Sequence, residues 1–367
     1  VGFVGHGGVG KTSLVEALLF SAGATTRLGK VDDGSTTTDF DPDEVKRKIS
    51  LNTAVAYCDW KGHRLNFVDT PGYGDFISDA RAGLRAVEAA VVVVDAVAGV
   101  QVQTEKVWKF ASEYNLPRVV VVNRMDRERA DFWRTLESLT KRLKARLVPL
   151  QIPVGAESGF KGVVDLIKMK AILYADGKPQ EAAIPGDLAD QAKEYRDKLS
   201  ESAAESDDEL LAKYLEEGGI GEAPMLKALR AAVASGKVIP VLAAAATKSI
   251  GSHPLLDLLI EAFPSPADRG EVEGIELKSK AAGRRLPDPK APLAALVFKT
   301  VSDPHVGKLS IFRVYSGTFR SDSQVYNASK EARERVGQVA WLQGKTQKAV
   351  EALGPGEIGV VTKLKET

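Results

Sequence analysis

A glycine-rich loop near the start of the chain limits its possible folds more than any other feature. Gly5, Gly10, Lys11 and Thr12 satisfy the pattern G-x-x-x-x-G-K-[ST]. An apolar run at residues 1–4 precedes the loop, and apolar residues at helical spacing follow it. Strand, loop and helix in this order predict a phosphate-binding loop. The alternative is a chance glycine turn between a strand and a helix.

The residue types in this loop suit the binding of a nucleoside polyphosphate. Glycines let successive backbone N–H groups turn inward around phosphates, and the following helix adds the positive end of its dipole. Lys11 is expected to reach the β- and γ-phosphates, and the Thr12 hydroxyl is expected to bind Mg²⁺. The predicted nucleotide contacts of the loop are Gly5, His6, Gly7, Gly8, Val9, Gly10, Lys11, Thr12 and Ser13.

A polar segment at residues 25–50 follows the first predicted helix. A connection of this length without clear periodicity is either disordered or functional. In a nucleotide-binding fold it lies where a loop that senses the γ-phosphate belongs. Two strand-like runs, at residues 53–58 and 64–68, then surround Lys61-Gly62 and predict a hairpin.

The second run of this hairpin ends in a D-x-x-G pattern at Asp69-Thr70-Pro71-Gly72. Asp69 can hold Mg²⁺ through water, and the Gly72 amide can bond the γ-phosphate, so that loss of this phosphate releases the segment. The pattern is weak alone, because many strands end in Asp followed by a Pro-Gly turn. Behind a phosphate loop and a polar loop it indicates a nucleotide switch.

A further buried strand, at residues 118–122, ends in an N-x-x-D pattern at Asn123 and Asp126. Ligands of open α/β sheets bind at such strand ends. The Asp126 carboxylate can accept two hydrogen bonds from the N1–H and amine of guanine, whereas adenine would leave it unpaired. The pattern therefore predicts a guanine nucleotide, with a simple helix N-cap at Asp126 as the alternative.

The apolar runs predict the architecture around these motifs. Runs at residues 89–94, 118–122 and 238–242 predict a mostly parallel sheet with helices on both faces. Between them, two amphipathic helices predict an inserted α+β subdomain at about 151–237, within a nucleotide-binding domain at 1–266. Their apolar faces are Leu188, Ala192, Tyr195 and Leu199 in one helix, and Leu210, Leu211, Tyr214 and Leu215 in the other.

The end of the chain has a different pattern. The charged, proline-rich span 267–292 is expected to be a linker. Strand-like runs without long helices between them then predict an all-β barrel domain at residues 293–367, and a sandwich fits almost as well. The runs are residues 294–301, 309–315, 336–342 and 358–364. The predicted fold class is thus an α/β P-loop GTPase domain followed by an all-β barrel.

Composition excludes several other classes of protein. The formal net charge of +1 provides no bulk field for a polyanion, so contacts with nucleic acid would need local patches. The four histidines show no metal-ligand spacing, and no apolar run approaches membrane-spanning length. The single cysteine, Cys58, cannot form an intramolecular disulfide, which is consistent with a reducing cytosol. We therefore expect a cytoplasmic protein without membrane contacts.

These motifs, the insertion and the final strands together resemble elongation factor G, the ribosomal translocase. The resemblance covers essentially the whole chain, including residues 303–309 and 314–317 of the last domain. It implies binding of GTP and GDP with Mg²⁺, hydrolysis of GTP, a monomer, and ribosomal RNA and proteins as partners. It also implies three further domains after residue 367, and the start inside a strand leads us to expect residues upstream.

Several positions depart from the family pattern near the phosphates. Tyr73 stands where the family has a histidine that orients the attacking water, and a phenol with a pKa of about 10 cannot copy an imidazole at about 6.5. Tyr73 could position water through its hydroxyl, or cover the site as an apolar gate. Gly8 replaces an aspartate, which removes a proposed cation contact. Ser50 replaces a threonine of the switch loop and keeps a hydroxyl for Mg²⁺.

The base-reading positions also differ. Arg124 replaces a lysine whose stem packs on the base, and arginine can stack there equally well. Ala245-Ala246 replaces Ser-Ala, so the backbone N–H of Ala246 is left to meet guanine O6. The resemblance implies catalytic roles for Lys11, Gly72 and Tyr73, and metal binding by Thr12, Ser50 and Asp69. The departures make the chain more similar to elongation factor G-like paralogues than to the main translocase.

Three functions remain compatible with this pattern. The first is a GTPase that hydrolyses GTP on the ribosome, with activity that Tyr73 could weaken. The second is a binding module, in which GTP orders the loops and licenses association without useful turnover. The third is a P-loop ATPase or small-molecule kinase, which would require Asn123 and Asp126 to be incidental.

The base-reading argument predicts selectivity for GTP over ATP. A carboxylate left without a partner by adenine costs about 1–3 kcal/mol, so ATP should displace a labelled guanine nucleotide about 5–150-fold less well than GTP. A competition titration with both nucleotides measures this ratio. Equal affinity would show that the N-x-x-D pattern does not read the base.

Overall fold

The computed structural model describes residues 1–205, 219–277, 279–303 and 307–367, together with residues 210, 212, 214 and 216. Two sequence predictions lie partly outside these residues. Leu211 and Leu215 of the second amphipathic face are not described, and neither is His305 within the segment 303–309.

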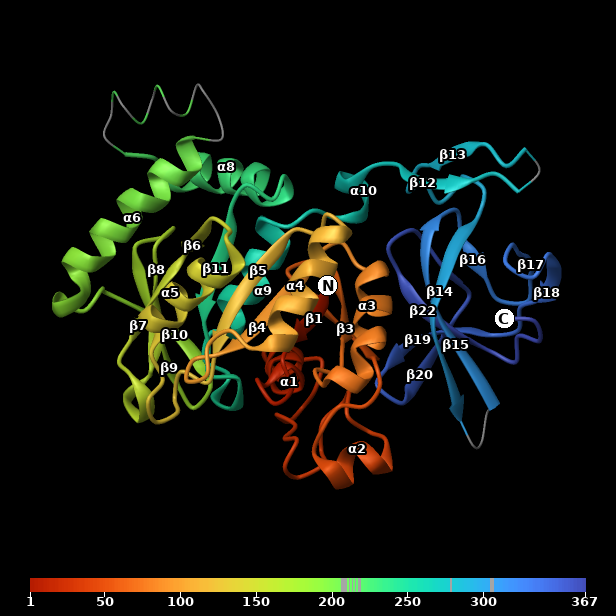
Figure 1. The fold of residues 1–367 in the computed structure, drawn as a ribbon, viewed down its shortest axis with the longest axis horizontal. Coiled ribbons are helices and arrows are strands. Elements are labelled where there is room, and N and C mark those ends of the chain that lie inside the picture. Colours follow the sequence, from red (N-terminus) through yellow and green to blue (C-terminus); the bar gives the residue numbers. More distant parts are fainter. Residues whose placement is uncertain are drawn as a thin grey trace.

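A seven-stranded sheet forms the centre of the molecule (Figure 1). Its strand order is β2-β3-β1-β4-β5-β11-β6, and only the pairing of β2 with β3 is antiparallel. The predicted mostly parallel sheet is therefore confirmed. The strands are β1 (Gly2–Gly5), β2 (Ala54–Trp60), β3 (His63–Asp69), β4 (Ala90–Asp95), β5 (Arg118–Asn123), β6 (Leu147–Pro149) and β11 (Ile239–Ala243).

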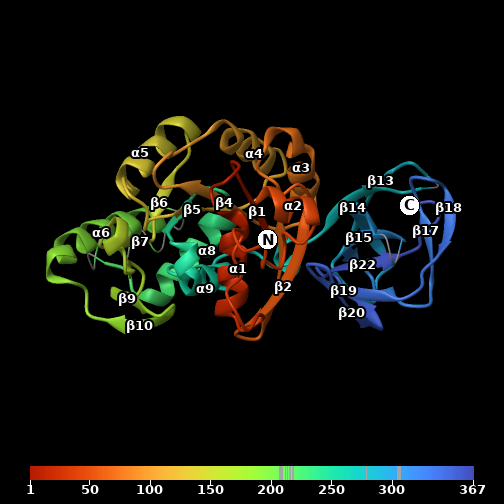
Figure 2. The ribbon, with the colours of Figure 1, turned by 90° about the horizontal axis from the view of Figure 1, so that it is seen from below.

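Helices cover both faces of this sheet, as the sequence predicts (Figure 2). Side chains of the inner strands alternate between two cores, because successive residues of a strand point to opposite faces. Val91 and Val93 lie in one core, and Val92 and Val94 in the other. The first core includes α1 (Lys11–Ser21), α6 (Ala189–Ala204), α8 (Glu222–Ala234) and α9 (Ser252–Glu261), and the second α3 (Ile77–Arg85), α4 (Val102–Glu113) and α5 (Phe132–Leu143).

The insertion has the predicted α+β composition, but the sequence pattern did not locate the strands of its sheet. Four antiparallel strands, in the order β10-β9-β8-β7, precede α6 and α8. They are β7 (Gln151–Val154), β8 (Gly162–Asp165), β9 (Lys170–Ala175) and β10 (Lys178–Ala182). The strands are short and β10 is largely exposed, so the stretch reads as a glycine-rich loop. The predicted helix is present as α6, with Ala192 and Leu199 buried.

The span expected to be a linker contains regular structure. It holds α10 (Pro266–Arg269) and a two-stranded hairpin of β12 (Val272–Ile275) and β13 (Ala282–Arg285). The hairpin side chains are mostly exposed, so its charged composition indicates a linker without revealing the strands. Within the described part of the chain, no helix is long and apolar enough to cross a membrane.

An antiparallel β-rich domain forms the last part of the chain, which confirms the prediction of an all-β domain there. Its main sheet has the order β14-β15-β22-β19-β20. The bounds are β14 (Ala294–Asp303), β15 (Gly307–Ser316), β16 (Phe319–Arg320), β17 (Gln324–Asn327), β18 (Ala332–Arg335), β19 (Val339–Gln343), β20 (Thr346–Val350), β21 (Ala352–Leu353) and β22 (Ile358–Thr362). β16 pairs with β21, and β17 with β18. The four predicted runs correspond to β14, β15, β19 and β22.

A buried arginine joins this last domain to the first. Arg313 of β15 is 2% exposed, donates a hydrogen bond of 2.7 Å to the carbonyl oxygen of Ala86 and forms an ion pair with Glu88. The Tyr315 hydroxyl donates to the carbonyl oxygen of Arg85, also across the boundary. The two domains are thus held by buried polar contacts as well as by apolar packing.

Replacement of Arg313 by methionine should destabilise the protein. The loss leaves Glu88 and a buried carbonyl without their cationic partner, so the free energy of unfolding should fall by about 3 kcal/mol. Urea denaturation followed by circular dichroism measures the change. Arg284→Met, at an exposed ion pair of the hairpin, is the control and should cost less than about 1 kcal/mol. Equal losses in both variants would contradict a structural role for Arg313.

Candidate nucleotide-binding site

The phosphate loop connects β1 to α1 in a conformation that glycine permits. Gly8 and Gly10 have φ values of +76° and +92°, and a Cβ on Gly10 would lie 2.5 Å from Nδ2 of Asn123. Side chains are disfavoured at such φ angles, so the backbone can curl without steric cost only with glycine. The curled backbone leads directly into α1, where the N-terminal N–H groups of the helix begin.

Lys11 is buried at the first residue of α1. Its ammonium donates to the carbonyl oxygens of Gly5 at 3.3 Å and His6 at 3.0 Å. Burial lowers the pKa of Lys11 to about 8, and the nearby Asp69 and Asp39 oppose this shift. The ammonium therefore lies inside the loop, at the place where a phosphate needs a positive charge.

The D-x-x-G segment lies against the same loop. A Cβ at Gly72 would collide with Nζ of Lys11 and would lie 2.6 Å from the carbonyl oxygen of His6 and 2.7 Å from the amide of Gly7. Thr70 anchors the segment by donating a 2.6 Å hydrogen bond to the carbonyl oxygen of Phe3. Only glycine fits at position 72, and its backbone faces the phosphate loop.

The three predicted metal ligands lie together. The Thr12 hydroxyl donates to Oδ2 of Asp69 at 2.8 Å and lies 3.0 Å from Oγ of Ser50. Thr38 donates a second 2.8 Å hydrogen bond to the same Asp69 oxygen. Oδ1 of Asp69 is buried without a hydrogen-bond partner among the described residues. Hydroxyl and carboxylate oxygens are what Mg²⁺ prefers, and the unpartnered oxygen is consistent with such an ion.

A second carboxylate, which the sequence analysis missed, lies beside this cluster. Asp39 is 4% exposed, and its side chain bonds to Ser50 and Thr12. Burial, and then the negative charge of Asp69, raise the pKa of Asp39, and burial also raises that of Asp69. Two buried carboxylates together favour a cation between them. The only sequence signal was an aspartate within the polar loop, and no spacing separates it from its acidic neighbours.

The polar loop at residues 25–50 is ordered by two buried glutamates. Oε1 of Glu16 accepts a 2.5 Å hydrogen bond from the amide of Thr37. Glu44, in α2 (Pro42–Arg47), accepts 2.9 Å hydrogen bonds from the amides of Leu51 and Asn52. Between these anchors the loop brings Thr38, Asp39 and Ser50 to Asp69. The loop is therefore a structured part of the site.

The base-reading residues surround Asn123. Its Nδ2 donates to the carbonyl oxygen of Val9 at 3.0 Å, and its Oδ1 accepts from the amide of Ala246 at 3.1 Å. Asn123 thus joins the phosphate loop to the Ala245–Ala246 turn. The Ala246 amide was expected to meet guanine O6, but here it is engaged with Asn123.

Two charged side chains complete this end of the site. Asp126 forms an ion pair of 3.4 Å with Nζ of Lys248, which holds the carboxylate next to the Ala246 turn. Arg124 is fixed by an ion pair of 2.8 Å with Asp95 and adopts a φ of +65°. The ion pair holds the guanidinium group itself, through Nη1.

Tyr73 lies over the phosphate loop. A Cβ on Gly7 would lie 2.8–2.9 Å from three atoms of the Tyr73 ring, and the side chain is 39% exposed. Among the remaining predicted contacts, Ser13 is half-buried in α1, and Nδ1 of His6 is buried without a hydrogen-bond partner among the described residues.

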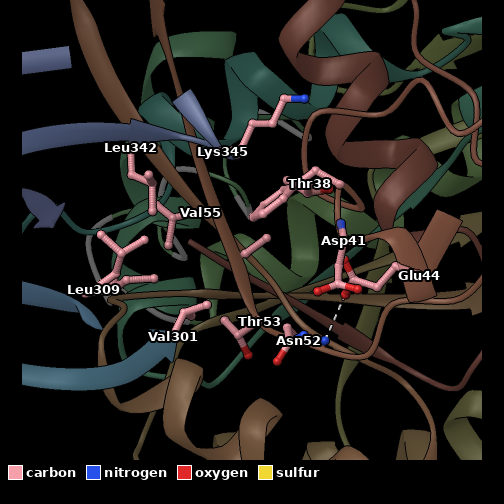
Figure 3. A pocket seen from close by; sticks show the side chains of 14 residues that line it. Thr38, Asp41, Glu44, Asn52, Thr53, Val55, Val301, Leu309, Leu342 and Lys345 are labelled. Atoms are coloured by element: carbon pink, nitrogen blue, oxygen red, sulfur yellow. Dashed lines mark hydrogen bonds between the residues drawn. The ribbon is translucent and has the colours of Figure 1, made fainter. Parts of the chain in front are cut away.

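A pocket separates the polar loop from the last domain (Figure 3). Thr38, Asp41, Glu44 and Asn52 line its polar side, and the opposite side is apolar. The apolar lining includes Val55, Val301, Leu309, Ile311 and Leu342. Beside it, the amide of Gly344 donates a 2.8 Å hydrogen bond to the carbonyl oxygen of Val55, and a Cβ at Gly344 would collide with the carbonyl oxygen of Thr37. The polar loop thus touches both the predicted metal ligands and the last domain.

Comparisons with known proteins agree with this geometry. The sequence profile described as Elongation factor Tu GTP binding domain matches residues 1–265, and that described as Elongation factor G domain 2 matches residues 292–367. Elongation factor G of Thermotoga petrophila is 42% identical over all of this chain and 54% of its own length, and that of Thermotoga maritima is 41% identical over the same shares. A crystal structure of a protein from Thermus thermophilus matches with a TM-score of 0.87 and 34% identity, over 99% of this chain and 52% of that one.

Together, the parallel sheet and the phosphate loop define a P-loop GTPase domain, here joined to an antiparallel β-rich domain. The chain belongs to the family described as Elongation factor Tu GTP binding domain, and it is similar to elongation factor G along all of its residues. It spans about half the length of these relatives.

Replacement of Asp69 by asparagine should weaken the binding of Mg²⁺. Loss of one buried carboxylate should raise the Mg²⁺ concentration needed for nucleotide binding by about 10–100-fold. Titration of Mg²⁺ against a fluorescent guanine nucleotide measures this change. Asp59→Asn, at an exposed carboxylate of β2, is the control and should leave the titration unchanged. An unchanged titration in Asp69→Asn would exclude Asp69 from the metal site.

Proposed function

We propose that the chain binds GTP with Mg²⁺, hydrolyses it to GDP and phosphate, and acts on the ribosome in translation. The observation that carries this proposal is the packing of Gly72 against Lys11 and the phosphate loop. A γ-phosphate bound by Lys11 would meet the backbone of the D-x-x-G segment directly. Hydrolysis would then remove this contact and release the segment.

Oxygen ligands for the metal come from two parts of the chain. Thr12 belongs to α1 and Asp69 to β3 of the central sheet, whereas Ser50 belongs to the polar loop. When bound, Mg²⁺ neutralises charge on the phosphate oxygens. The Lys11 ammonium contributes a second positive charge at these oxygens. Because Ser50 reaches the cluster through the folded loop, a bound ion would add its own contact to the hydrogen bonds of Glu16 and Glu44 that already order the loop.

The guanine base is proposed to bind between Asn123, Asp126 and the Ala245–Ala246 turn. The Asp126 carboxylate accepts from the base, and Arg124 stacks against it. Asn123 acts by holding the phosphate loop and the Ala246 turn together, as its two hydrogen bonds support. Contact of guanine O6 with the Ala246 amide requires that this amide be shared with Asn123.

The family membership supports a ribosomal role. We propose that residues 1–266 form the GTP-binding domain with its insertion at about 151–237, and that residues 267–292 connect it to the domain at 293–367. The last domain and the surface around Tyr73 would face ribosomal RNA and protein, using local Arg and Lys side chains because the net charge is only +1. For this role we propose that the protein acts as a monomer in the cytoplasm.

A second function is supported by Tyr73 itself. The residue stands at the position expected to orient the attacking water, and its ring lies against Gly7. A phenol is a poor substitute for imidazole as a proton acceptor at neutral pH. The chain would then be a GTP-dependent binding module, with loops that the nucleotide orders and with little turnover.

Single-turnover hydrolysis of GTP with and without ribosomes distinguishes the two functions. A ribosomal GTPase should be stimulated by at least about a hundredfold, the scale at which a positioned general base or an added catalytic group acts. Tight GTP binding without stimulation supports the binding module.

Tyr73→His is the matched variant for this assay. If Tyr73 limits turnover, the imidazole should raise the rate by about 10²-fold or more. No gain would show that Tyr73 is not the limiting residue. Tyr326→His, at an exposed tyrosine of the last domain, serves as the control.

A further inference from the structure

Gly7 is unlike the other glycines of the phosphate loop, because a neighbouring side chain and not its own φ angle disfavours a larger residue there. Gly5, Gly8 and Gly10 have φ values of +150°, +76° and +92°, whereas Gly7 has a backbone conformation that any residue can adopt. The three atoms nearest to a Cβ at position 7 all belong to the ring of Tyr73, at 2.8, 2.8 and 2.9 Å. Contacts this short require that the ring move. Gly7 therefore accommodates one particular side chain.

The position of Tyr73 is fixed from both sides. Gly72 before it lies against Lys11 and the His6 carbonyl oxygen. Gly74 after it begins a short 3-10 helix, and a Cβ there would lie 2.8 Å from Nε2 of Gln103 in α4. The Tyr73 carbonyl oxygen accepts a 3.1 Å hydrogen bond from the amide of Phe76. Because the backbone is held in this way, only rotation of the side chain can lift the ring off Gly7.

The ring of Tyr73 lies against the loop that is predicted to surround the phosphates. Gly7 is part of the loop that surrounds the phosphates, and Lys11 lies within that loop. Three ring atoms of Tyr73 lie against Gly7, and the residue is 39% exposed to solvent. A group at this place obstructs the exchange of water and of phosphate with the interior. The atoms of Tyr73 nearest to Gly7 belong to the ring, so an obstruction of this kind would come from the ring and would not need the hydroxyl.

We propose that Tyr73 is a lid on the phosphate-binding loop and that Gly7 is its seat, so that the pair sets the rate at which guanine nucleotide leaves. This inference rests on the proposed nucleotide binding and goes beyond it. It assigns Tyr73 a role in retention that is separate from any role in hydrolysis. It also assigns Gly7 a positioning role: because it has no side chain, Gly7 leaves room for the Tyr73 ring to lie on the loop.

A double-mutant cycle on nucleotide dissociation tests the pair. The probe is a fluorescent GDP, displaced by excess unlabelled GDP in stopped flow, on the whole chain with Mg²⁺. Tyr73→Ala should speed dissociation by about tenfold, and Gly7→Ala should do the same by lifting the ring. In the Tyr73→Ala background, Gly7→Ala should change the rate by less than about twofold, because no ring remains to collide. A purely structural defect at Gly7 would instead add its full effect in both backgrounds.

Two conservative variants separate the ring from the hydroxyl. Tyr73→Phe keeps the ring on Gly7 and should leave the dissociation rate unchanged, whatever it does to hydrolysis. Tyr326→Ala, at a 49% exposed tyrosine remote from the site, should also leave it unchanged. If Gly7→Ala does not fold, the contrast between Tyr73→Ala and Tyr73→Phe still decides the proposal.

The outcomes are distinct from those of the hydrolysis assay. Unchanged dissociation in Tyr73→Ala, equal acceleration by Tyr73→Phe, or an equal effect of Gly7→Ala in both backgrounds would overturn the lid. Failure of the wild-type chain to bind the fluorescent GDP would overturn both this inference and the proposed function. A third result is also possible: the ring slows nucleotide release, but GTP is not hydrolysed either in the presence or in the absence of ribosomes. This result would support the lid and reject the GTPase.

Discussion

The burial of the Lys11 ammonium is the constraint on which the rest of the site depends. An ammonium removed from water needs hydrogen-bond acceptors or negative charges around it. Here the carbonyl oxygens of Gly5 and His6 accept hydrogen bonds from the ammonium, and Asp69 and Asp39 lie close enough to raise its pKa against the effect of burial. The close approach of Gly72 to this ammonium then brings the D-x-x-G segment to the same point. One buried charge thus gathers the loop, the strand end and the two carboxylates.

The polar loop extends this organisation to the last domain. Glu16 of α1 and Glu44 of the loop itself accept hydrogen bonds from backbone amides that would otherwise lose their partners on leaving water. Thr38 is bonded to Asp69, and the neighbouring Thr37 packs on Gly344 of the last domain. A short chain of contacts therefore connects Asp69 to the last domain.

The sequence predicted the parts of the fold that follow local rules. Buried strands such as 89–94 are continuous apolar runs, and α6 follows a helical spacing, so both were predicted. The four strands of the insertion were missed, because they are short, partly exposed and separated by glycines. The hairpin at 272–285 was missed for the same reason, since its exposed charged residues have the composition of a linker. Short strands are defined by their pairing partners, which a local pattern does not contain.

The candidate site likewise has features that the sequence predicted and features that only the fold revealed. The sequence by itself determined the chemistry: the phosphate loop, the D-x-x-G and the N-x-x-D motifs have fixed spacings because backbone N–H groups and a few side chains must meet one ligand. Only the tertiary structure decided that Asp39 joins Asp69, that the Ala246 amide is engaged by Asn123, and that the Tyr73 ring rests on Gly7. These are contacts between segments that are far apart in the chain or free in their spacing. Their geometry follows from packing and burial, which no single segment specifies.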